Sequence, residues 1–124
     1  MGERADHLKR ARDNRAFAAR LVSTDNPDPT DVQWAVTAAF YSALHLVEAT
    51  FALHGIHCEH HRDRPMIMNQ VGISIDVQKA YRSLQGFSEE ARYGLTDFSV
   101  SFFKMTVIIR YLEQIERALL PPES

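Results

Sequence analysis

A short segment after Gly55 concentrates residues that could carry chemistry. The ten residues IHCEHHRDRP contain three histidines, one cysteine, two acids and two arginines. Nitrogen and sulfur are the ligands that zinc prefers in tetrahedral sites. Such sites usually take pairs of ligands from separate places, whereas these residues are neighbours, and the other ligands would have to be His7 or His45. We therefore assign no metal ligand and expect no cofactor.

Three other catalytic patterns find no support in the sequence. His45 and Glu48 are three residues apart, but a carboxylate-bridged dimetal bundle needs Glu-x-x-His on two helices, and here the order is reversed and occurs once. There is no G-x-S-x-G segment for a hydrolase nucleophile. The five glycines are scattered, so no phosphate-binding glycine loop is present. We assign no catalytic residue on these grounds.

Six polar side chains could form a ligand-binding site, and they are Tyr41, His45, His61, Arg64, Arg92 and Tyr93. Tyr41 and His45 share one face of a long predicted helix. His61 and Arg64 lie three residues apart in the next short element, and the last two precede the final helix. If they converge, the arginines could hold a phosphate while the tyrosines stack on a base. The same groups could equally form a buried network that fixes how the loop region docks.

The elements that must position these residues are all predicted helices. We expect helices over residues 3–22 and 30–54, and a short helix that is capped by Asp63 and broken by Gly72. We also expect a helix over 75–85 that stops at Gly86, a single turn over 88–93 capped by Ser88, and a helix from 98 to about 119. The segment Thr30–Gln33 matches a capping box, and Gly55 suits the left-handed residue after a helix. An apolar stripe runs along residues 30–54, formed by Val32, Val36, Ala39, Phe40, Ala43, Leu44, Val47 and Phe51.

The last predicted helix is apolar on two sides. Its core stripe consists of Phe98, Phe102, Met105, Ile109, Leu112, Ile115 and Leu119. A second stripe consists of Phe103, Val107 and Tyr111. A helix with two apolar sides is either central or covered by another chain, so we expect a homodimer. The fold class predicted overall is all-α, an up-down bundle of four to five helices forming one domain over residues 1–124.

Composition excludes several classes of protein. The chain has 124 residues and a formal net charge of −2, which gives no global attraction to nucleic acid or to anionic membranes. Residues 1–22 do carry six basic against three acidic side chains, a weak indication of an anionic partner. Cys58 is the only cysteine, so no internal disulfide can form. With no signal-like segment and no apolar run near 18 residues, we expect a cytoplasmic protein without membrane association.

The motifs in their order along the chain resemble the HEPN superfamily of small helical domains. They are Trp34, the run Phe40-Tyr41-Ser42-Ala43-Leu44-His45, then Glu48-Ala49, Gly55, His61-Arg62-Asp63-Arg64, Tyr81-x-x-Leu84 and Ser88-x-x-Ala91-Arg92-Tyr93. The resemblance is to a bacterial branch and covers roughly residues 30–120. It implies a four- or five-helix bundle, often dimeric. It also implies a role among RNA-cleaving toxins, modules paired with nucleotidyltransferases, or accessory domains associated with nucleic acid.

The nuclease signature of the catalytic HEPN proteins is missing here. That signature is Arg-x(4–6)-His, and no histidine of this chain has an arginine five to seven residues upstream. The resemblance therefore favours a non-catalytic module that binds a nucleotide, RNA or a protein partner such as a nucleotidyltransferase. One alternative is a ribonuclease with a degenerate site, in which His61 acts as acid or base and Arg64 or Arg92 stabilises the phosphorane. Another is an antitoxin-like bundle that only binds protein.

Overall fold

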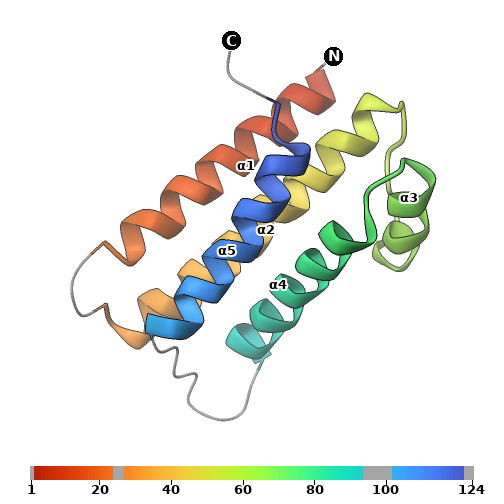
Figure 1. Ribbon diagram of the computed structural model, residues 1–124. Coiled ribbons are helices and arrows are strands. Elements are labelled where there is room, and N and C mark those ends of the chain that lie inside the picture. The colour runs from red at the N-terminus through yellow and green to blue at the C-terminus, as the bar shows by residue number, and fades with distance from the viewer. Residues whose placement is uncertain (1, 24–26, 94–101, 122–124) are drawn as a thin grey trace.

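The computed structural model describes residues 2–23, 27–93 and 102–121, with the side chains of 102–104 left out. Within these residues the chain forms five α-helices and no strand (Figure 1). The helices are α1 (Gly2–Leu21), α2 (Pro29–Leu53), α3 (Arg64–Gln70), α4 (Ile75–Tyr93) and α5 (Phe102–Leu119), and a 3-10 turn, η1 (His61–Asp63), precedes α3. This confirms the predicted all-α bundle.

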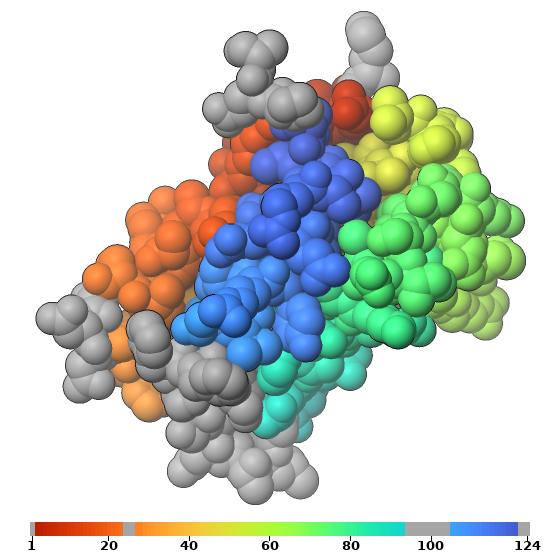
Figure 2. All heavy atoms as spheres, viewed as in Figure 1, coloured from red at the N-terminus to blue at the C-terminus, as the bar shows by residue number. Residues whose placement is uncertain are grey.

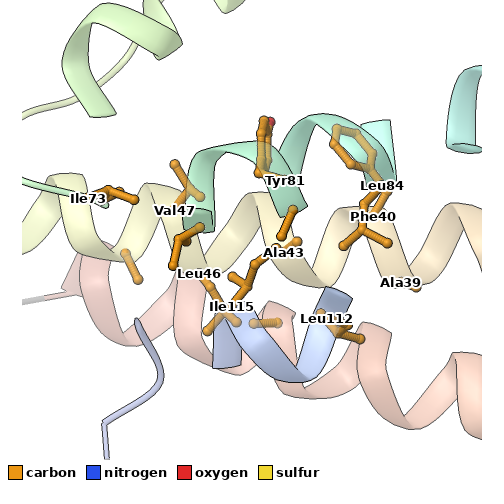
Figure 3. Packing of buried hydrophobic residues seen from close by; sticks show 14 of the residues in the cluster. Ala39, Phe40, Ala43, Leu46, Val47, Ile73, Tyr81, Leu84, Leu112 and Ile115 are labelled. Carbon is orange, nitrogen blue, oxygen red and sulfur yellow. The ribbon is translucent and has the colours of Figure 1, made fainter. Parts of the chain in front are cut away.

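Helix α2 is the centre of the bundle. It packs against α1 on one side and against α4 and α5 on the other, while η1 and α3 cover one end of the α2–α4 pair (Figure 1). The predicted stripe of α2 is confirmed, since all its members are buried except the half-buried Leu44. Side chains of α2, α4 and α5 interdigitate in the core, among them Ala39, Phe40, Ala43, Leu46, Val47, Tyr81, Leu84, Leu112 and Ile115 (Figure 3).

The start of α2 differs from the predicted capping box. The helix begins at Pro29, and the N-cap is Asp28, whose Oδ1 accepts a hydrogen bond from the backbone N–H of Thr30 at 3.0 Å. Thr30 is already helical, so it cannot act as the cap. Proline at the first helical position fits this arrangement because its missing N–H would have no partner there.

Two glycines end helices as the sequence predicts. Gly55 has φ +73° after α2, and Gly72 has φ +80° after α3. Beyond α2, the N–H of Ile56 donates to the carbonyl of Phe51 at 2.9 Å, and the N–H of Gly55 donates to Ala52. This pair of bonds is a Schellman motif, and α3 ends in the same way. Asp63 precedes α3 but makes no side-chain capping bond, contrary to the prediction.

Helix α4 is longer than predicted. It continues through Gly86 to Tyr93, so the separate turn expected over residues 88–93 is wrong. Gly86 keeps a negative φ and is exposed, and a glycine in a helix interior costs only about 0.5–1 kcal/mol relative to alanine. Phe87 and Ala91 pack against the core and hold the helix together past that point. Ser88, predicted as a cap, is fully buried inside the helix.

The core stripe of α5 is shifted from the predicted one. Ile108, Leu112 and Ile115 are fully buried, whereas Ile109 is only half-buried. Of the second stripe, Val107 and Tyr111 are half-buried within this one chain. The predicted helix start at Phe98 and the side chains of Phe102 and Phe103 lie outside the part of the chain that is described. Figure 2 shows α5 in the middle of one face, between α1 and the α3–α4 side.

Helix α2 is also the one helix in the described ranges that is long and apolar enough to cross a membrane. In the fold, 67% of its most apolar stretch is buried inside the bundle. A core helix that contacts several neighbours must be apolar on most of its surface. Its hydropathy is therefore accounted for by packing.

Candidate functional site

A cleft of about 250 Å³ opens between η1–α3 and α4. One wall comes from η1 and α3, and the other comes from α4, and together they are His61, Arg62, Arg64, Pro65, Met68, Gln78, Tyr81, Arg82 and Gln85. The four α4 residues lie on one side of that helix because they are spaced by three, one and three residues. Among the described residues that line this cleft there are three arginines and one histidine, and none of these residues carries a carboxylate. Its walls are therefore suited to an anion.

A buried ion pair fixes the inner wall of the cleft. Arg64 and Glu48 are each only 6% exposed. The Arg64 Nη2 and Nε atoms both donate to Glu48 Oε1, at 2.7 and 3.1 Å. Glu48 stands on α2, so the pair fastens α3 to the central helix. Because Glu48 neutralises Arg64, the remaining charge of the cleft comes from its other cations.

The same guanidinium sets the tautomer of His61. Arg64 Nη1 lies 3.0 Å from His61 Nδ1. Arginine can only donate hydrogen bonds, so Nδ1 must be the acceptor and the imidazole proton sits on Nε2. The His61 side chain is exposed at the mouth of the cleft. It therefore presents an N–H donor that a ligand oxygen can accept from.

Tyr81 contributes a buried hydroxyl to the cleft wall. Its Oη has no hydrogen-bond partner in good geometry among the described residues. In Figure 3 the hydroxyl end points away from the aliphatic side chains of α2 and α5. Burial raises the Tyr81 pKa to about 12, although the nearby Arg64 partly offsets this. The phenol thus stays protonated near neutral pH and retains a donor that a buried acceptor would satisfy.

Arg62 and Arg82 are the two uncommitted cations of the cleft. Both line it, from η1 and α4 respectively, and both are exposed. Neither has an ion pair or a hydrogen bond within residues 2–23, 27–93 and 102–121. An arginine fork that is not held by the protein can bind a phosphate or carboxylate in bidentate fashion.

A second cluster joins the middle of α2 to the C-terminal end of α4. Arg92 Nη1 donates to Tyr41 Oη at 3.2 Å and to Tyr93 Oη at 3.4 Å. The guanidinium carbon lies 5.7 Å from the Tyr41 ring centroid and 4.9 Å from that of Tyr93. Both distances fall within the range of cation–π contacts. Tyr41 is half-buried, whereas Tyr93 is 71% exposed, so one tyrosine anchors the arginine and the other faces solvent.

His45 belongs to a third group, formed with α1. Its Nδ1 lies 3.0 Å from Nδ1 of His7, and the two rings stack with centroids 5.2 Å apart. One of the two nitrogens must carry the proton and the other must accept it. Burial lowers the His45 pKa to about 4, with further contributions from His7 and two arginines, so the neutral ring is favoured. Glu3 extends this group, and its Oε1 lies 2.7 Å from Nδ1 of the exposed His57. This contact raises the pKa of His57.

The six residues predicted as one site are therefore divided among three groups. His61 and Arg64 come together at the cleft, Tyr41 joins Arg92 and Tyr93, and His45 turns to α1. No hydrogen bond or ion pair joins one group to another in the described chain. The cleft also contains residues that sequence reasoning missed, namely Arg62, Gln78, Tyr81, Arg82 and Gln85. Arg62 and Tyr81 belong to the motifs His61–Arg64 and Tyr81-x-x-Leu84. Membership of these motifs was the only feature of the sequence that could have indicated them as site residues.

The histidine-rich segment does not converge on a metal. Within the residues described, no three His, Cys, Asp or Glu side chains are arranged to hold an ion. Cys58 instead donates through Sγ to the carbonyl of His60 at 3.2 Å, and burial raises its thiol pKa. A thiol with a raised pKa is a poor nucleophile and a poor metal ligand.

Comparison with models of known protein families found no match, and comparison with curated proteins found no significant relative. The resemblance to HEPN domains therefore rests on the ordered motifs alone and stays a prediction. The helical bundle agrees with the fold that the resemblance implies, but many unrelated families share that fold.

Proposed function

We propose that this chain is a non-catalytic, HEPN-like module that binds a phosphate-bearing ligand, most simply a nucleotide, in the cleft between η1–α3 and α4. The observation that carries the proposal is the pair of uncommitted arginines, Arg62 and Arg82, lining a cleft whose described residues include no carboxylate. The Nε2–H of His61 and the hydroxyl of Tyr81 add two donors. Donors alone, without acceptors of opposite charge, select an anion.

The size of the cleft supports a small ligand. At about 250 Å³ it lies just below the range of about 300–1,000 Å³ typical of small-molecule pockets. It therefore suits one nucleotide, or the phosphate and sugar of one, rather than a large cofactor. Pro65 and Met68 supply an apolar side against which a sugar or base can pack.

The ribonuclease alternative has weaker support. It needs His61 as acid or base and Arg64 or Arg92 to stabilise the phosphorane. Arg64 is committed to Glu48 and to His61 Nδ1, and Arg92 is committed to two tyrosines. Incubation of the protein with a mixed RNA substrate tests this alternative, because cleavage that disappears in His61→Ala would establish catalysis.

Calorimetric titration with UMP and with inorganic phosphate tests the binding proposal. A charge-assisted hydrogen bond contributes about 1.5–3 kcal/mol, so Arg82→Ala should weaken UMP binding roughly 10- to 100-fold. The matched control is Lys79→Ala, which removes one exposed positive charge from the same helix outside the cleft. Absence of UMP and phosphate binding, or equal losses in both variants, would contradict the proposal and favour the protein-binding alternative.

The homodimer and the cytoplasmic location also belong to this proposal. Val107 and Tyr111 retain some exposed apolar surface on α5, which supports association with a second copy. Sedimentation velocity at tens of micromolar protein tests it, and a monomer at that concentration would remove the homodimer from the proposal.

A further inference from the structure

We propose that the cleft is one end of a binding track for single-stranded nucleic acid, and that a base at the other end stacks on Tyr93. This rests on the proposed function, because it takes the phosphate of one nucleotide to lie in the cleft. It adds a second subsite, formed by Tyr41, Arg92 and Tyr93, and it names the ligand as a strand rather than a free nucleotide.

The geometry of α4 connects the two subsites. Tyr81, Gln85 and Arg92 follow one another at intervals of four and seven residues, so they lie on the same face of the helix. Tyr81 and Gln85 line the cleft, and Arg92 holds the second cluster. At 1.5 Å per residue, Arg92 lies about 10 Å beyond Gln85 along the axis. Neighbouring nucleotides of an extended strand can bridge such a distance.

The second cluster has the features of a stacking platform. Arg92 occupies the space beside the Tyr93 ring, with its guanidinium carbon 4.9 Å from the ring centroid. The ring is nevertheless 71% exposed, which leaves surface for a base. Tyr41 also holds the arginine, through a hydrogen bond and a ring contact. Aromatic rings beside an arginine bind bases of any sequence by stacking and cation–π attraction.

The distribution of charge favours a single strand over a duplex or an acidic protein surface. A duplex contact requires a broad basic surface, whereas the chain as a whole has a net charge of −2. Here the cations are few: Arg62 and Arg82 line the cleft, and Arg92 lies beside the exposed ring of Tyr93. That combination matches a strand whose phosphates and bases are both accessible. The exposed Glu89 lies three residues before Arg92 and would oppose a passing phosphate.

Fluorescence anisotropy with labelled six-nucleotide strands, together with UMP titration, tests the proposal. Oligouridylate RNA and oligothymidylate DNA are both measured, so that binding of RNA is distinguished from binding of DNA. Tyr93→Ala should weaken hexamer binding about 5- to 100-fold and leave UMP affinity unchanged. Tyr93→Phe should retain hexamer binding, because the ring remains, and Glu89→Gln should tighten it.

The matched control is Phe17→Ala. Phe17 is 41% exposed on α1 and also has an arginine over its ring, Arg20, at 5.8 Å. Its loss should leave hexamer binding unchanged. If UMP binds through Arg82 but the hexamer binds no tighter, or if Tyr93→Ala has no effect on the hexamer, the track is wrong while the proposed function stands. If neither UMP nor either hexamer binds, both proposals are wrong.

Discussion

Removing one member of the buried ion pair should destabilise the whole bundle. Glu48→Ala leaves the Arg64 guanidinium with 7% side-chain exposure and without its carboxylate partner. Breaking a buried pair in this way typically costs about 3–5 kcal/mol. At roughly 2.1 cal/mol/K of unfolding entropy per residue, a chain of 124 residues should lose about 10–20 °C in Tm. Since a small domain has only about 5–15 kcal/mol of stability, this is a large fraction.

The assay is urea unfolding followed by circular dichroism at the helical band, with thermal unfolding as a second measurement. Glu48→Gln keeps an oxygen that Arg64 can donate to and should cost less than Glu48→Ala. The double variant Glu48→Leu/Arg64→Met should recover most of the loss, because two apolar side chains replace two buried charges. If Glu48→Ala costs under about 1 kcal/mol, like a surface pair, the reasoning about this ion pair is wrong.

Two further predictions concern a histidine and the glycines. The His45 pKa is depressed from 6.5 to about 4, so its contribution to stability is present above pH 6.5 and is lost as the pH falls towards 4. Because the ring is partly exposed, we discount this effect and expect the free energy of unfolding to fall by about 1–2 kcal/mol between pH 7 and pH 4.5, as measured by urea unfolding. His45→Asn should remove this loss. An unchanged pH dependence in His45→Asn would contradict the prediction. Gly86→Ala should stabilise the fold by about 0.5–1 kcal/mol, because a Cβ there meets no other atom and φ is already negative. Gly55→Ala should destabilise the fold, because Gly55 has φ +73°. A loss of stability in Gly86→Ala would show that α4 is not a regular helix at that residue.

The fold could be predicted from the sequence because its helices are strongly periodic. The stripe of α2 and the stops at Gly55 and Gly72 follow from local patterns, and the structure confirms them. The break expected at Gly86 was wrong because tertiary packing of Phe87 and Ala91 outweighs the weak helix propensity of one glycine. Local propensity carries no information about such packing.

The candidate site could be predicted only in part, and α2 shows why. Tyr41 and His45 are four residues apart and differ by about 40° around the helix axis. On a helix with only one buried face, two residues that differ by this angle would still meet the same neighbouring element. On α2, which contacts four other helices, it directs Tyr41 to Arg92 of α4 and His45 to His7 of α1. Sequence spacing places residues on a face but does not say which neighbour the face meets.

The attachment of α1 has a consequence for the native-state dynamics of the protein. This helix packs mainly on α2, and its buried contacts are largely small, with Ala11 and Ala18 among its three buried residues. Small side chains bring backbones close but remove little apolar area from water. We therefore expect the amides of α1 to exchange with solvent earlier than those of α2, as a separate cooperative unit that opens below the global free energy of unfolding. Each opening would release the His45 imidazole from His7 and free it to take up a proton, so that mild acid should selectively increase the population of molecules with α1 detached.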